Sequence, residues 1–143
     1  MLSAEVRGRT TQEAMHLMGD TSFYATIPTS DLERARQFYE SVLGLTPIRD
    51  LGPEVVYRAG SSEFDVYTTE SAGTAQHTLG TFVVGDIRAV VDGLRARGVV
   101  FEEYDFPGLK MEDGVAQLGP DKVAWFKDPD GNILALTQEN ATG

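Results

Sequence analysis

The segment from Lys122 to Gln138, KVAWFKDPDGNILALTQ, constrains the fold of this chain more than any other stretch. An apolar run stops at Asp128-Pro129-Asp130-Gly131, and apolar alternation resumes at Ile133. Asp at the first turn position can accept a hydrogen bond from the backbone ahead of it, Pro presets φ at the second position, and Gly closes the fourth. The segment therefore predicts two strands joined by a tight turn.

The first half of the chain predicts the order strand, helix, strand, strand, strand. FYATIPT alternates as a strand with Pro28 at an edge or end, and Ser30 offers a helix cap with Glu33 three residues on. Gly44 stands just beyond the helix as its C-cap. The apolar stripe of the helix has a 3.6-residue period and comprises Leu32, Ala35, Phe38, Tyr39, Val42 and Leu43. The three strands that follow are expected at 46–50, 54–58 and 63–68.

The same order recurs after a small, polar stretch, SAGTAQ, at residues 71–76. TLGTFVVG predicts a strand, Asp86 caps a helix, and Gly98 ends it. The buried stripe of this helix is expected to be Ile87, Val90, Val91 and Leu94, and the later strands are expected at 99–104, 122–127 and 133–137. The predicted organisation is an N-terminal tail (1–20), a first module (21–70), a linker (71–77), a second module (78–139) and a tail (140–143).

This duplication, together with a DPDGN turn feeding a last strand, resembles the vicinal-oxygen-chelate superfamily of glyoxalases, bleomycin resistance proteins and extradiol dioxygenases. The resemblance covers about residues 22 to 138. It implies an α+β fold of two tandem βαβββ modules, whose curved mixed sheets surround a cavity and carry the helices on the outside. It also implies a homodimer, as in many relatives.

Strand alternation assigns each residue to one face of these sheets. The residues expected under the helices are Ala25, Ile27, Phe64, Val66, Thr78, Gly80, Phe82, Val84, Leu134 and Leu136. The residues expected to face the cavity are Tyr24, Thr26, Asp65, Tyr67, His77, Leu79, Thr81, Ile133, Ala135 and Thr137.

The resemblance also locates the positions where metal-using members carry ligands. Tyr24 stands seven residues before Asp31, where such members carry His. Leu79 stands seven residues before Asp86, where they often carry His or Gln. Ala135 occupies the place of the carboxylate in the last strand, and Asp65 is its first-module counterpart. One phenol and one carboxylate fall short of the three good donors that a divalent metal needs. We therefore expect no metal and no other cofactor.

A metal-free pocket can still bind a small molecule through aromatic side chains and charge. Trp125, Tyr24, Tyr67 and Tyr57 would form the aromatic wall, and Asp65 or Glu63 would meet a cationic or hydroxylated ligand. The predicted ligand-binding residues are Tyr24, Thr26, Asp65, Tyr67, His77, Leu79, Trp125 and Ala135. Each also has a structural interpretation: Trp125 is equally suited to anchor a core or an interface, the tyrosines to fill the sheet, and His77 to face solvent.

Two other functions fit the same sequence. The first is a lyase, isomerase or dioxygenase that uses a relocated metal at His77, Asp65 and Glu63, or acid–base chemistry by Asp65, His77 and Tyr24. The second is a non-catalytic interaction module whose cavity is filled by its own side chains. The segment 105–121, rich in Gly and Pro, is expected to be a long loop that closes over the pocket or is stapled to the surface.

Composition limits the partners and the compartment. The net charge of −10 argues against binding nucleic acid or an anionic membrane surface, because both require a basic face. No apolar run is long enough to cross a membrane. The absence of cysteine excludes thiolate chemistry and favours a reducing cytoplasm.

Overall fold

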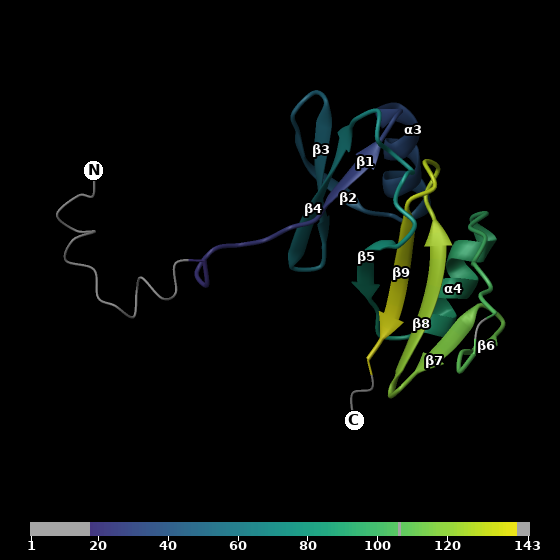
Figure 1. Cartoon of the computed structure of the whole chain (residues 1–143). Helices are drawn as coiled ribbons and strands as arrows, with labels where there is room; N and C mark the ends of the chain where they lie inside the picture. The colour runs from purple at the N-terminus through teal and green to yellow at the C-terminus, as the bar shows by residue number, and fades with distance from the viewer. Residues whose placement is uncertain (1–17, 106, 140–143) are drawn as a thin grey trace, which may run out of the picture.

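The computed structural model describes residues 18–105 and 107–139 and contains two mixed β-sheets (Figure 1). Residues 1–17 of the expected N-terminal tail (1–20) and the expected tail at 140–143 lie outside the described residues. The first sheet has the strand order β1 (Thr26–Thr29), β4 (Ser62–Thr68), β3 (Glu54–Ala59) and β2 (Thr46–Asp50). The second has the order β5 (Thr78–Val83), β9 (Ile133–Gln138), β8 (Asp121–Lys127), β7 (Val115–Leu118) and β6 (Lys110–Glu112). The α+β fold with two modules, as predicted, is confirmed.

Each sheet carries a helix after its first strand; in Figure 1 the first helix lies to the right of β3 and β4, and the second lies to the right of β5 and β9. The first begins as α3 (Leu32–Arg36) and continues as a π-helical segment, η1 (Gln37–Val42). The second is α4 (Ile87–Ala96), which Asp86 caps as predicted by accepting from the Ala89 amide. The predicted cap of the first helix was wrong, because Asp31 accepts from the Arg34 amide at 3.1 Å. No described helix is long and apolar enough to cross a membrane.

The predicted strand at residues 99–104 is not formed. Phe101 makes only an isolated antiparallel bridge to Phe126, and its side chain is buried in the core. The remaining strands of this sheet come instead from the segment 105–121, where the sequence predicted a loop. Asp113 and Gly114 both have positive φ (51° and 84°), which is the geometry of a type I′ hairpin turn between β6 and β7.

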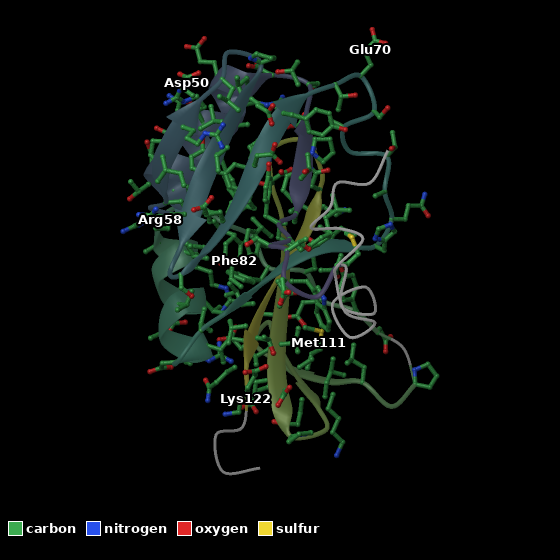
Figure 2. All side chains as sticks on the ribbon, turned by 90° about the vertical axis from the view of Figure 1, so that its left-hand side faces the viewer. Asp50, Arg58, Glu70, Phe82, Met111 and Lys122 are labelled. Carbon is green, nitrogen blue, oxygen red and sulfur yellow. The ribbon has the colours of Figure 1, made fainter. Side chains whose placement is uncertain are left out.

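One continuous core joins the helix-covered sides of the two sheets. Phe82 lies at the centre of the molecule, where the two modules meet (Figure 2). Its ring centroid is 6.0 Å from that of Phe64 in the first sheet, and Phe38 of the first helix lies 6.3 Å from Phe126 of the second sheet. Because the core is on the helix side, the opposite faces of both sheets are turned away from it.

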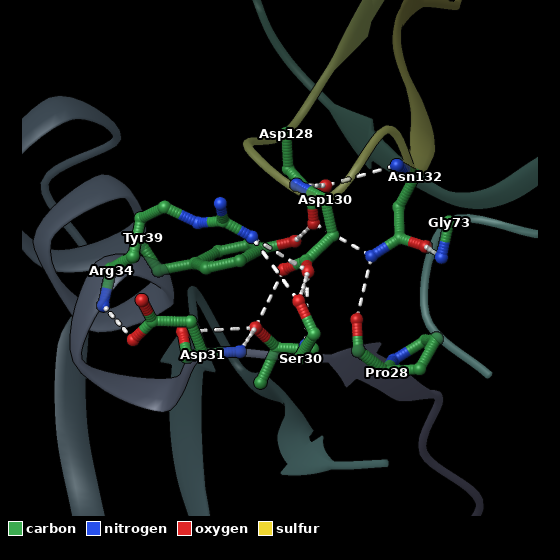
Figure 3. Close-up of polar contacts among 10 residues, drawn as sticks. Pro28, Ser30, Asp31, Arg34, Tyr39, Gly73, Asp128, Asp130 and Asn132 are labelled. Atoms are coloured by element: carbon green, nitrogen blue, oxygen red, sulfur yellow. Dashed lines mark hydrogen bonds and ion pairs between the residues drawn. The ribbon is translucent and has the colours of Figure 1, made fainter. Parts of the chain in front are cut away.

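The predicted hairpin turn at residues 128–132 is present, and it docks onto the first module (Figure 3). Asp128 organises it: Oδ1 accepts from the amides of Asp130 and Asn132, each at 2.9 Å. Oδ2 accepts from the hydroxyl of Tyr39 at 2.7 Å and from the side-chain amide of Asn132 at 2.8 Å. Burial, followed by the charge of Asp128, raises the pKa of Tyr39, so this hydroxyl remains a donor.

Asp130 and Asn132 extend the contact to the start of the first helix. Asp130 accepts from the Thr29 hydroxyl (2.6 Å), from the Ser30 amide and hydroxyl (2.9 and 2.7 Å) and from Arg34 (2.9 Å). Asn132 donates to the Pro28 carbonyl at 2.7 Å and accepts from the Gly73 amide at 3.4 Å. We call residues 128–132 with these partners the clasp, since they join the last hairpin to the first strand and helix.

Substituting Gly73 by Ala tests how closely the linker approaches the clasp. Gly73 has φ +77°, and a Cβ there would overlap the carbonyl oxygen of Asp130. Gly60 is the matched control, because it has φ +61° and a Cβ added there would have nothing within 4 Å. We expect both to lose about 1 kcal/mol from the backbone conformation, and Gly73→Ala to lose about 2 kcal/mol more from the overlap. Urea unfolding measures both, and equal losses would contradict the close approach.

Replacing Asp130 by Asn tests the charged part of the clasp. Burial alone would raise the pKa of Asp130, but the donors Thr29 and Ser30, with the charge of Arg34, outweigh it and hold that pKa below its ordinary value. A depressed carboxyl pKa stabilises the fold above the unfolded value of about 3.9 and loses that effect as pH falls through the folded value. We expect Asp130→Asn to cost about 1–2 kcal/mol at neutral pH. The difference from the wild type should shrink as the pH falls below the unfolded value of about 3.9, as measured by urea unfolding, and a pH-independent difference would contradict a role for the charge.

Candidate functional site

The faces of the two sheets that turn away from the core carry the candidate site. Seven of the residues expected under the helices belong to the core or pack against it: Ile27, Phe64, Val66, Phe82, Val84, Leu134 and Leu136. Alternation therefore places their strand neighbours on the opposite faces, which we call the open faces.

On the open face of the first sheet, Thr26, Asp65, Val56 and Arg49 form one row across four strands. Asp65 and Val56 are buried at the floor of this row, and Thr26 and Arg49 are exposed at its ends. Tyr67, two residues beyond Asp65 in β4, is 37% exposed at the rim. A buried floor with an exposed rim is the arrangement expected of a curved sheet that can surround a ligand.

Asp65 is the chemically unusual residue of this face. It is only 3% exposed, and no donor among the described residues reaches its Oδ1 atom. Glu54 lies diagonally across the sheet from it, since Val56 and Asp65 are cross-strand partners. Hydrogen bonding with Asp65, then burial, then the charge of Asp65 raise the pKa of Glu54, and the charge of Arg49 opposes them. The sequence analysis did not identify Glu54, because its proximity depends on the strand register.

On the open face of the second sheet, Thr81, Ala135 and Trp125 form the corresponding row. Ala135 is buried at the floor, and Trp125 is half-buried. The ring of Tyr104 meets that of Trp125 edge-on, with centroids 5.2 Å apart. The amide of Tyr104 also lies 3.1 Å from the sulfur of Met111 in β6. Trp125, one ring of this pair, is therefore the cross-strand partner of Ala135, which occupies the position of the family's last-strand carboxylate.

The other predicted site residues lie elsewhere. Leu79 packs against the core, because a register shift between Thr78 and Gly80 interrupts the alternation of β5, so its expected place on the cavity face was wrong. His77 is exposed, with Nδ1 3.2 Å from the Thr78 carbonyl oxygen. Tyr24 lines a different hollow of about 260 Å³, between the sheets and beside Phe64 and Phe82.

The described residues contain no group of three or more His, Asp or Glu side chains placed to hold a metal ion. The relocated site expected from His77, Asp65 and Glu63 is not assembled in this part of the chain: Glu63 is exposed and lies 3.9 Å from Arg58, while Asp65 is buried at the floor of its sheet. The donor set at the family's metal positions also does not fit, since Leu79 and Ala135 offer no donor atom.

The chain is similar to known proteins over most of its length. The family profile of the Glyoxalase/Bleomycin resistance protein/Dioxygenase superfamily matches residues 21–136. The chain is 29% identical over 126 residues to lactoylglutathione lyase GLX1 of Arabidopsis thaliana, covering 78% of this chain but only 42% of that protein. It is 26% identical to lactoylglutathione lyase of Haemophilus influenzae, covering 83% of this chain and 93% of that protein.

Solved structures share the fold at low sequence identity. TnmS3, an antibiotic binding protein from Streptomyces sp. CB03234, has a TM-score of 0.60 and 22% identity, covering 84% of this chain and 98% of that one. FosX, a fosfomycin resistance protein from Listeria monocytogenes, has a TM-score of 0.64 and 13% identity, covering 86% and 96%. With the family profile covering most of the two modules, this chain belongs to the Glyoxalase/Bleomycin resistance protein/Dioxygenase superfamily.

Proposed function

We propose that this protein binds a small organic molecule, without a metal, between open faces of its sheets. The observation that carries this proposal is the side-chain set at the family's metal positions. Ala135 presents a methyl group, Leu79 is directed to the core, and Tyr24 lines a separate hollow. Asp65 alone keeps a carboxylate, which is too few donors for Lewis-acid chemistry on a substrate.

The second open face supplies the binding surface for an aromatic ligand. Trp125 is half-buried, so one part of the indole is held by the protein while another is available for stacking. Ala135, small and next to Trp125 in the sheet, leaves room above the floor. The fold shared with TnmS3, described as an antibiotic binding protein, supports sequestration of this kind. The missing cysteines are in keeping with a cytoplasmic location.

The enclosure of such a ligand would come from a second copy of the chain. Val83 is 66% exposed on the open face of the second sheet, and Leu118 of the same sheet is 43% exposed. Exposed apolar side chains gathered on one face are typical of a surface that another chain covers. In the proposed homodimer, the first sheet of one copy faces the second sheet of its partner, and the two faces form one cavity.

No specific observation favours the acid–base enzyme. That mechanism needs Asp65, His77 and Tyr24 within hydrogen-bond reach of one substrate. Asp65 is at the floor of the first open face, Tyr24 lines the hollow between the sheets, and His77 is exposed beyond β4 at the start of β5. The binding proposal therefore takes precedence over the enzymatic one.

Substituting Val83 by Lys tests the homodimer. A charge on the proposed interface should weaken association by about tenfold or more, because a desolvated lysine without a partner is costly. Val100 provides the matched control: it is 76% exposed and precedes Phe101, whose side chain is directed into the core. Sedimentation velocity should show the wild type and Val100→Lys at twice the chain mass, and Val83→Lys shifted toward the single chain. A monomeric wild type would contradict the shared cavity.

Titration with 2-naphthalenemethanol, a neutral planar aromatic compound, tests the binding surface. We expect saturable binding by calorimetry after dialysis against a chelator, accompanied by a change in the emission of Trp125, the single tryptophan. Trp125→Ala should weaken binding about tenfold, the usual scale of a lost stacking contact, and Trp125→Phe should weaken it less.

Phe23→Ala is the control for this titration, because Phe23 is 95% exposed and borders the hollow between the sheets rather than an open face. Loss of binding on Phe23→Ala but not on Trp125→Ala would move the ligand to that hollow. Stoichiometric Fe, Mn, Ni or Zn that survives dialysis would contradict a metal-free site.

A further inference from the structure

The open face of the first sheet contains two carboxyl groups without a basic partner. Asp65 is 3% exposed, and its Oδ1 atom has no donor among the described residues. Glu54 lies beside it, two residues before Val56, the cross-strand partner of Asp65. Neither forms an ion pair with a lysine or arginine of the described chain. A buried carboxylate left without a donor is costly, so something must supply a proton or a positive charge.

The groups around the pair do not supply that charge. Arg49 stands in the row of Asp65, but Val56 lies between them in the sheet. Of the effects on the pKa of Glu54, the charge of Arg49 is the smallest, and the pKa of Glu54 remains raised. Glu63, two residues before Asp65 in β4, lies against Arg58, and Thr26 adds only a hydroxyl on the other side. The two carboxyl groups therefore lie side by side with no positively charged partner among the described residues.

Tyr67 completes the surroundings of the pair. It is the cross-strand partner of Glu54 and stands on the same face, 37% exposed. An aromatic ring beside two carboxyl groups is a combination that favours an alkylammonium group, because the ring face and the carboxylates both attract a positive charge. The net charge of −10 adds a long-range attraction for a cation.

We propose that Glu54, Asp65 and Tyr67 form a subsite for an alkylammonium group of the ligand. The proposal deepens the binding function argued above and rests on it. The ammonium nitrogen donates to both carboxylates, including the Asp65 Oδ1 atom that has no donor among the described residues. Glu54 is half-buried, so its carboxylate remains partly accessible to the ligand.

Two probes that differ only in charge test the subsite. 2-Naphthylmethylamine carries an ammonium group, and 2-naphthalenemethanol is its neutral counterpart. Calorimetry on the wild type at neutral pH should show the amine binding about tenfold more tightly, as expected for charge-assisted hydrogen bonds.

Asp65→Asn and Glu54→Gln should each bring the two probes to about equal affinity, because each removes one of the carboxylates that would accept from the ammonium group. Glu63→Gln is the matched control, because Glu63 is an exposed carboxylate on the same strand that already pairs with Arg58. It should keep the preference for the amine. Two variants are used so that a folding defect in one does not decide the result.

The outcomes separate the two proposals. Equal binding of both probes by the wild type would overturn the ammonium subsite and leave the metal-free cavity standing. Binding of neither probe would overturn both. A preference that survives Asp65→Asn and Glu54→Gln, or uptake of Mn²⁺ by the wild type that Asp65→Asn abolishes, would also overturn the ammonium subsite.

Discussion

The structure depends on the carboxylate of Asp128. It accepts hydrogen bonds from Asp130, Asn132 and Tyr39 and is itself only 5% exposed, so it is stabilised by hydrogen-bond donors that the fold holds in place. The turn it shapes presents Asp130 to the start of the first helix and Asn132 to Pro28. One side chain near the end of the chain therefore fixes the position of the first strand relative to the last hairpin.

This constraint determines which faces are available for function. The clasp holds the modules together at the helix side, and a continuous aromatic core lies there. Its ring contacts run from Phe82 to Phe64, Tyr39, Phe38 and Phe126. The other faces of both sheets are left with buried floors and exposed rims. The candidate residues consequently fall into two groups, Asp65 with Tyr67 on the first sheet and Ala135 with Trp125 on the second, and no strand of one sheet pairs with a strand of the other among the described residues.

The parts of the fold that local chemistry determines were predictable. The Asp128–Gly131 turn, the Asp86 cap and the helix stripes depend on residues within a few positions of one another. Asp113-Gly114 was an equally local hairpin signal that the sequence analysis missed. Ser30 has the right residue type for a cap, but the structure uses its hydroxyl to hold Asp130, a residue 100 positions away.

Other features depend on contacts that a single strand does not reveal. Val99 and Phe101 are apolar because they fill the core, and their burial does not distinguish this segment from a strand. The register shift at Leu79 reverses its face, since one extra residue inverts the alternation. Asp65 was identified by its type and position, whereas its neighbour Glu54 emerges only when β3 and β4 are aligned.

The proposed loss of the metal explains why Asp65 has such unusual surroundings. At a metal position, the carboxylate oxygen that binds the cation needs no hydrogen-bond donor from the sheet around it. Here Ala135 and Leu79 supply no donor atom for a cation, yet Asp65 remains at the floor of the first open face with no donor at Oδ1 among the described residues. A buried acceptor without a partner is unfavourable in the free protein and favourable as soon as a donor arrives. The same carboxylate that would complete a metal site in a relative can therefore select a positively charged organic group in this chain.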